Sequence, residues 1–97
     1  MAVNYIDYDV LHDGEKSYAT QAATIRDVIS SIKKMNDALM QGWSNETARA
    51  FVQRIDTDHI DKLEKASAAL DEVSMYIKNY LANKQDEDTQ GAGAISG

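Results

Sequence analysis

The spacing of apolar residues in two long segments constrains this sequence more than any other feature. In the first segment, from about Asp7 to Met40, apolar or aromatic residues recur in steps of four, three, four and three between Tyr18 and Ile32. These steps are the a/d spacing of a heptad repeat, which predicts a long helix with one packed stripe. The predicted stripe contains Tyr18, Ala22, Ile25, Ile29, Ile32 and Leu39.

The second segment, from about Glu46 to Lys84, repeats the pattern. From Leu63 onward its steps are three, four, three, four and three, and the stripe is interrupted around Asp58 and His59. Two segments of similar length predict two matched helices. The predicted stripe of the second helix contains Ile55, Leu63, Ala66, Leu70, Val73 and Ile77.

Asn36 falls on the stripe of the first segment and has two interpretations. It is either a polar residue near the helix end that reaches solvent, or a buried asparagine that fixes the register of packed helices.

The two segments are separated by a short break at residues 41–45. We expect Gly42 to adopt the left-handed conformation that ends a helix, and Ser44 or Asn45 to cap the next helix, with Glu46 in its first turn. So short a connection folds two helices back on each other. The fold class is therefore predicted to be all-α, an antiparallel helical hairpin over residues 1–84.

The last residues, 85–97, have a different composition. They are acidic at Asp86, Glu87 and Asp88 and then become rich in Gly and Ala, without apolar periodicity. We expect them to form a flexible tail.

A single hairpin of this length has little interior of its own. It buries its apolar stripe fully only if a second surface covers it. We therefore expect two hairpins to dimerise into a four-helix bundle, and self-pairing about a two-fold axis favours a homodimer over pairing with a related hairpin.

Charge and composition exclude several function classes. The net charge is −6, and the acids at 86–88 account for half of it, so residues 1–84 have a mixed surface without the basic stripe that nucleic acid or an anionic membrane requires. The chain has no Cys. The cluster of Asp56, Asp58, His59 and Asp61 is interpreted as a solvated helix face rather than a metal site. We expect no cofactor and no enzymatic activity.

The N-terminal residues do not have the pattern of a cleaved secretory leader. Residues 1–10 contain neither Lys nor Arg and no continuous apolar run. If the protein is exported, we expect a route that needs no cleaved signal peptide.

Trp43 is the only Trp and lies in the predicted turn, where we expect it to close the end of the hairpin near Phe51. At this point the sequence resembles the WXG, or ESAT-six-like, family, whose motif is Trp-x-Gly in the turn and an aromatic residue eight positions later. Here the motif reads Trp43-Ser44-Asn45, with Phe51 at the eighth position and Asn in place of Gly. The resemblance covers about residues 5–84.

The resemblance implies a secreted or co-secreted substrate of a type VII secretion system, which acts as a helical adaptor and contacts the secretion ATPase. The family's Tyr-x-x-x-Asp/Glu export signal is not matched, because Lys84 stands four positions after Tyr80. Tyr80 is nevertheless the candidate secretion contact. Two alternatives stay open: a heterodimeric helical chaperone of a larger secreted toxin, and a cytoplasmic coiled-coil interaction module.

Overall fold

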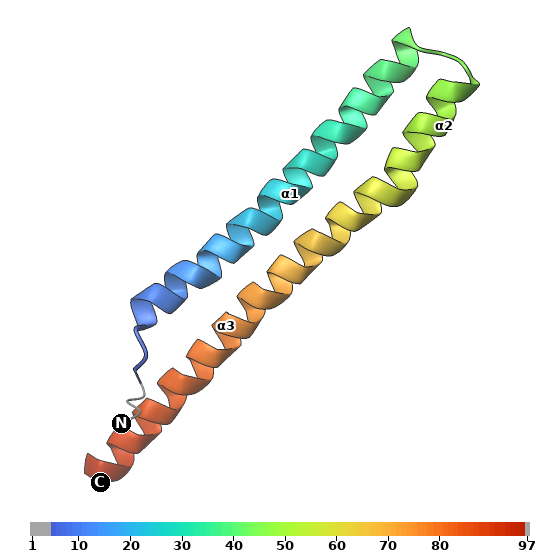
Figure 1. Ribbon diagram of the computed structural model, residues 1–97. Coiled ribbons are helices and arrows are strands. Elements are labelled where there is room, and N and C mark those ends of the chain that lie inside the picture. Colours follow the sequence, from blue (N-terminus) through green and yellow to red (C-terminus); the bar gives the residue numbers. More distant parts are fainter. Residues whose placement is uncertain (1–4, 97) are drawn as a thin grey trace.

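The computed structural model describes residues 5–96, and the side chains of residues 5–86. The chain forms two long rods that run antiparallel and join at one short turn (Figure 1). The first rod is α1 (Tyr8–Gly42), and the second is a continuous succession of α2 (Glu46–Arg54), the π-helical turn η1 (Ile55–His59) and α3 (Ile60–Ser96). The molecule measures 75 × 24 × 17 Å. The predicted all-α helical hairpin is confirmed.

Both rods begin at a side-chain cap. The Asp7 carboxylate accepts a hydrogen bond from the Val10 amide at 3.2 Å and starts α1. Asn45 starts α2, because its Oδ1 accepts from the Ala48 amide at 2.8 Å, and Glu46 lies in the first turn as expected. These bonds satisfy amide groups that have no partner within the helix.

The turn is built differently from the prediction. Gly42 is the last residue of α1, and no residue in the described part of the chain has a positive φ, so the expected left-handed Gly42 was wrong. Extended residues make the turn instead: Trp43 has φ −142° and ψ 91°, and Asn45 has φ −150° and ψ 179°. Extended backbone carries the chain across to the second rod, and the Asn45 cap then starts α2 without a left-handed residue.

Small and polar residues form much of the contact between the rods. Seven of the eight buried side chains among the described residues recur every seven residues, and this set is called the inner seam; its members are Ala22, Ile29 and Asn36 on α1, and Ile60, Ser67, Ser74 and Leu81 on α3. The eighth, Ala48, lies on α2 near the turn. The Ser74 hydroxyl donates to the Glu15 carbonyl of α1 at 2.9 Å, and the Ser67 hydroxyl donates to Glu64 on its own helix at 2.9 Å. Small side chains at these positions let the rods approach closely.

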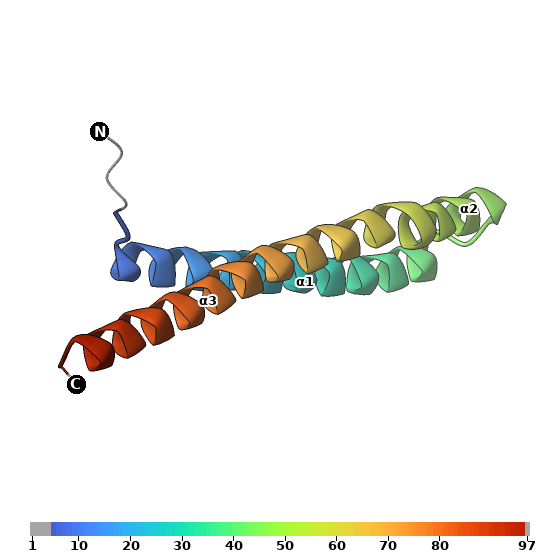
Figure 2. The ribbon, with the colours of Figure 1, turned by 90° about the horizontal axis from the view of Figure 1, so that it is seen from below.

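The rods cross at a shallow angle (Figure 2), which is typical of helices packed through a seven-residue repeat. Helix α3 continues past Lys84 to Ser96, through most of the segment for which the sequence predicted a tail. None of the helices within residues 5–96 combines the length and the apolar character needed to cross a bilayer.

Candidate interaction surface

The predicted stripe residues lie at three different depths. Ala22 and Ile29 are buried between the rods, whereas Tyr18, Ala66 and Val73 are exposed. The others are half-buried: Ile25, Ile32, Leu39, Ile55, Leu63, Leu70 and Ile77. The stripe therefore contains part of the inner seam together with a flank that one hairpin does not cover.

The sequence prediction missed the buried residues of α3. Ile60, Ser67, Ser74 and Leu81 form its part of the inner seam, yet none belongs to the predicted stripe. Their seven-residue spacing was present in the sequence, but two of the four positions are serines, and an apolar pattern does not detect them. Each serine hydroxyl donates to a backbone carbonyl, so burial of the serine leaves no polar group without a hydrogen-bond partner.

One side of the hairpin carries the uncovered apolar residues, and this surface is called the uncharged face. Its half-buried members are Leu11, Ile25, Ile32 and Leu39 of α1, and Leu63, Leu70 and Ile77 of α3. Its exposed members are Tyr18, Val28, Met35, Val73 and Tyr80. A groove lined by Ile32, Ile55 and Leu63, with His59 and Lys62, joins the two rods on this side.

Charge is partitioned around α1 and along α3 from Leu63 to Asn83, whereas Lys62 and Lys84 lie on the uncharged side at the two ends of that stretch. A residue of α1 lies on the uncharged side if it stands two, three or six positions after an inner-seam position. None of these α1 residues is Asp, Glu, Lys or Arg, and the same holds for α3 between Leu63 and Asn83. All nine charged residues of α1 lie elsewhere on the helix: Asp9, Asp13, Glu15, Lys16, Arg26, Asp27, Lys33, Lys34 and Asp37. A helix face free of charge over this length is typical of a surface that another helix covers.

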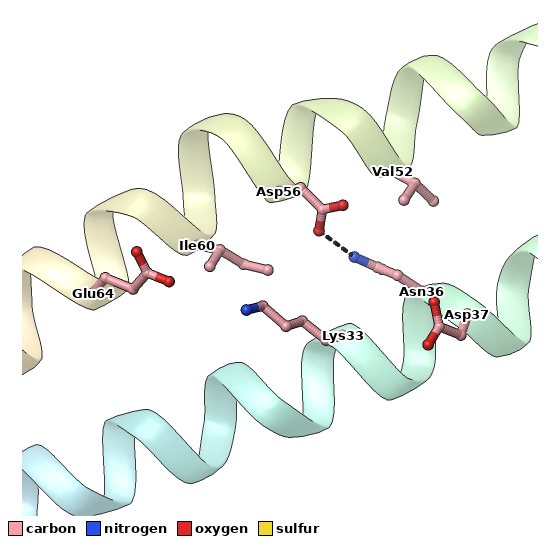
Figure 3. A pocket seen from close by; sticks show the side chains of 7 residues that line it. All are labelled: Lys33, Asn36, Asp37, Val52, Asp56, Ile60 and Glu64. Carbon is pink, nitrogen blue, oxygen red and sulfur yellow. Dashed lines mark hydrogen bonds between the residues drawn. The ribbon is translucent and has the colours of Figure 1, made fainter.

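The opposite side of the hairpin is polar. Arg26 of α1 and Asp71 of α3 form an ion pair across the rods at 2.8 Å, with both side chains about half exposed. Farther along, a groove is lined by Lys33, Asn36, Asp37, Val52, Asp56, Ile60 and Glu64 (Figure 3). The charged side chains of this side are exposed, so it is suited to contact with water.

Asn36 is the polar member of the inner seam on α1. It is only 4% exposed, and its Nδ2 donates to Asp56 Oδ1 of η1 at 3.3 Å (Figure 3). Of the two interpretations of this residue, the structure shows the buried asparagine. This hydrogen bond links Asn36 of α1 to Asp56 of the π-helical turn and so places these two residues opposite each other.

The corner contains the residues on which the family resemblance rests. Trp43 is half-buried and its ring lies 5.6 Å from that of Phe51, with the ring planes tilted by 50°. Phe51 remains 45% exposed. Ser44 is exposed, and Asn45 is exposed while capping α2. The two rings pack together, and part of the pair stays open to solvent.

The acidic cluster in and after η1 is occupied by ion pairs. Asp58 contacts Lys62 at 3.2 Å, and Asp61 contacts Lys65 at 3.0 Å. The hydrogen bond from Lys62, and then its charge, hold the pKa of the Asp58 carboxyl below its ordinary value. Among the described residues, no group of three or more His, Asp or Glu side chains is placed to hold a metal ion.

Tyr80 lies at the open end of the hairpin, far from the corner. It is 38% exposed and lines a groove with Tyr5, Ile6, Asp7, Val10 and Leu11. This groove, called the open-end groove, brings the predicted secretion contact next to the start of α1.

The chain was compared with known proteins in three ways. No protein-family model matches it, and neither a curated protein nor a solved structure gives a significant match.

Proposed function

We propose that this protein is a non-enzymatic helical adaptor that pairs with a second copy of itself and is exported as a substrate or co-substrate of a type VII secretion system. The observation that carries the proposal is the uncharged face. It extends along both rods and leaves Val28 44%, Met35 59% and Val73 39% exposed in a single hairpin. The resemblance of the Trp43 corner to the WXG motif supports the secretion part.

The energetics favour pairing of two hairpins. On α1 the uncharged face is about 50 Å long, since some 35 helical residues rise about 1.5 Å each, and on α3 it is about 30 Å long, over residues 63–83. Each helix contributes a width of about 8–10 Å. Roughly 800 Å² of each copy is then available, which is the usual area contributed to a stable interface. Burial of that area contributes about 20 kcal/mol before the costs of association and side-chain ordering, which offset most of it.

Secretion is tested in the organism that encodes the chain. The protein should accumulate in the medium of the parent strain, and deletion of the type VII ATPase should remove it from the medium and retain it in cells. A cytoplasmic enzyme followed in the same samples controls for lysis. Release that persists without the ATPase would contradict the secretion role.

The contribution of Tyr80 is tested with a matched pair of variants. Tyr80→Ala should lower the amount released, because it removes the ring from the open-end groove. Met75→Ala is the control, since Met75 is 51% exposed on the polar side of the same helix. Equal release by both variants would argue against Tyr80 as a secretion contact.

A dedicated chaperone that pairs with the helices of a larger secreted protein is the second candidate. An uncharged face fits a related hairpin as well as an identical one, because it carries few charges that would select a partner. The chaperone role predicts that the protein purified alone is monomeric or heterogeneous. A sharp dimer of about twice the 10.7 kDa chain mass favours the adaptor role.

A further inference from the structure

Among the described residues, two methionines are exposed, and they lie on different sides of the hairpin. Met35 of α1 is 59% exposed on the uncharged face, six positions after the inner-seam residue Ile29. Met75 of α3 is 51% exposed on the polar side, one position after Ser74. Met40 is half-buried. The hairpin therefore carries one exposed methionine on the surface proposed for pairing and one of similar exposure outside it.

Met35 has uncharged neighbours on its own helix. Residues three and four positions apart are neighbours on a helix surface, and for Met35 these are Ser31, Ile32, Ala38 and Leu39. Ile32 and Leu39 are half-buried, so Met35 extends the apolar surface on which they lie. The only side-chain hydrogen-bond donor in this group is the Ser31 hydroxyl. A helix packed over this stretch would cover the Met35 sulfur mainly with apolar groups.

The thioether of an exposed methionine is open to two-electron oxidation by a peroxide. A lone pair of the sulfur attacks one oxygen of hydrogen peroxide, an S–O bond forms and the O–O bond breaks. The transferred oxygen gives its proton to the departing hydroxide, which leaves as water. The sulfur is oxidised and the peroxide is reduced, and a polar sulfoxide replaces an apolar group.

We propose that Met35 is an oxidation site that controls the pairing of the hairpin, with a peroxide as the oxidant. The proposal rests on the self-pairing in the proposed function and adds its regulation. An unpaired hairpin exposes Met35 to the oxidant, whereas pairing through the uncharged face covers it. Oxidation therefore takes place on the unpaired copy and removes that copy from the pairing equilibrium.

Burial of the sulfoxide opposes pairing, because its oxygen loses hydrogen bonds to water. The single hydroxyl of Ser31 replaces only part of them. A sulfoxide at Met75 stays in water on the polar side and has no such effect. We expect oxidation of Met35 to raise the dissociation constant at least about ten-fold, which corresponds to about 1.4 kcal/mol.

Peroxide reactivity at two protein concentrations tests whether pairing covers Met35. The wild type is treated with dilute hydrogen peroxide well below and well above its dissociation constant, and the added oxygen is located by fragmentation in the mass spectrometer. Met35 should react several-fold more slowly in the dimer, whereas Met75 should react at one rate in both samples. A Met35 that reacts equally fast in both samples, or that does not react in the monomer, contradicts the proposal.

Two leucine variants test the consequence of oxidation. Leu preserves an apolar side chain of similar volume but has no sulfur to oxidise. The wild type, Met35→Leu and Met75→Leu are oxidised as monomers and then compared with their untreated forms by sedimentation equilibrium. The wild type and Met75→Leu should lose affinity at least about ten-fold, a change of about 1.4 kcal/mol, and Met35→Leu should keep its affinity. Equal losses in the two variants would overturn the assignment to Met35.

Glutamine variants reproduce the polar side chain without an oxidant. Met35→Gln should weaken pairing as the sulfoxide does, and Met75→Gln should leave it unchanged; equal affinities would contradict the proposal. The proposed function fails differently. An untreated wild type that stays monomeric contradicts the self-pairing itself, whereas a dimer whose affinity is unchanged after Met35 is oxidised contradicts the oxidation site alone.

Discussion

At the scale of single residues, the hairpin is held together by side chains that are unusual in a helical core. The inner seam contains Asn36, Ser67 and Ser74, each nearly buried and each with a hydrogen-bond partner. Polar residues in a seam reduce its stability. Asn36 and Ser74, which bond across the rods, also restrict its register, because any other pairing would leave them without these partners. The rods therefore have one preferred alignment.

This role of Asn36 predicts opposite effects of two substitutions. Asn36→Leu should raise the free energy of unfolding by about 1 kcal/mol, because an apolar side chain replaces a buried amide and the exposed Asp56 regains water. Asp56→Ala should lower it by about 1–2 kcal/mol, because the buried amide loses its partner. Urea denaturation measures both, and a destabilising Asn36→Leu would contradict the register role.

The corner predicts a graded loss. Trp43→Ala should destabilise the hairpin by about 2 kcal/mol, less than the 3–5 kcal/mol typical of a fully buried Trp, because Trp43 is half-buried and loses its contact with Phe51. Ser44→Ala is the control, since Ser44 is exposed, and it should change stability by less than about 0.5 kcal/mol. Thermal unfolding followed by circular dichroism compares them.

At the scale of elements, the two rods differ in regularity. Helix α1 keeps one repeat from Ala22 to Asn36, whereas the second rod changes register at η1. The change lies opposite Asn36, whose hydrogen bond to Asp56 joins α1 to η1. The π-helical turn therefore lies where Asp56, one of its residues, also accepts the hydrogen bond from Asn36.

Single-residue deletions test this view of η1. The Ile60 amide of η1 donates to the Ile55 carbonyl five residues earlier, so the turn holds one residue more than an α-helical turn. Removal of Thr57 takes out that residue, so η1 should become ordinary α-helix and stability should change by less than about 1 kcal/mol. Removal of Ala69, which is also exposed, rotates the rest of α3 by about 100° and should cost several kcal/mol. Equal tolerance of the two deletions, measured by urea denaturation, would contradict the assigned register.

The elements themselves were largely predictable from the sequence, because heptad spacing and a short break give two antiparallel helices. Three features were not. The buried serines are polar and cannot be recognised in a pattern of apolar residues. Gly42 suggested a left-handed turn, but the extended residues Trp43 and Asn45 make the turn without one. The interruption at Asp58 and His59 was visible, but only hydrogen bonding shows that it is a π-helical turn.

At the scale of the whole molecule, the hairpin has one polar side and one uncharged side. The polar side carries the Arg26–Asp71 pair and the groove around Lys33, which suit contact with water. The uncharged face has half-buried and exposed apolar residues along both rods. This division predicts assembly through the uncharged face and solubility through the other.

The assembly should respond weakly to salt. An interface with few charges along its length loses little when ions screen electrostatic attraction, and only the part around Lys62, in the groove that joins the rods, should be affected. The dissociation constant measured at low and at moderate sodium chloride should agree within about five-fold, which corresponds to about 1 kcal/mol. A much larger weakening with salt would indicate an interface on the charged side.

Sedimentation equilibrium of the wild type and two Glu variants tests the central claim most directly. Val73 on the uncharged face and Met75 on the polar side are 39% and 51% exposed on the same helix, so Val73→Glu and Met75→Glu form a matched pair. The wild type and Met75→Glu should sediment as dimers of the 10.7 kDa chain. Val73→Glu should dissociate at least about 30-fold more readily, a change of about 2 kcal/mol. A monomeric wild type, or equal dimerisation of both variants, would contradict assembly through the uncharged face.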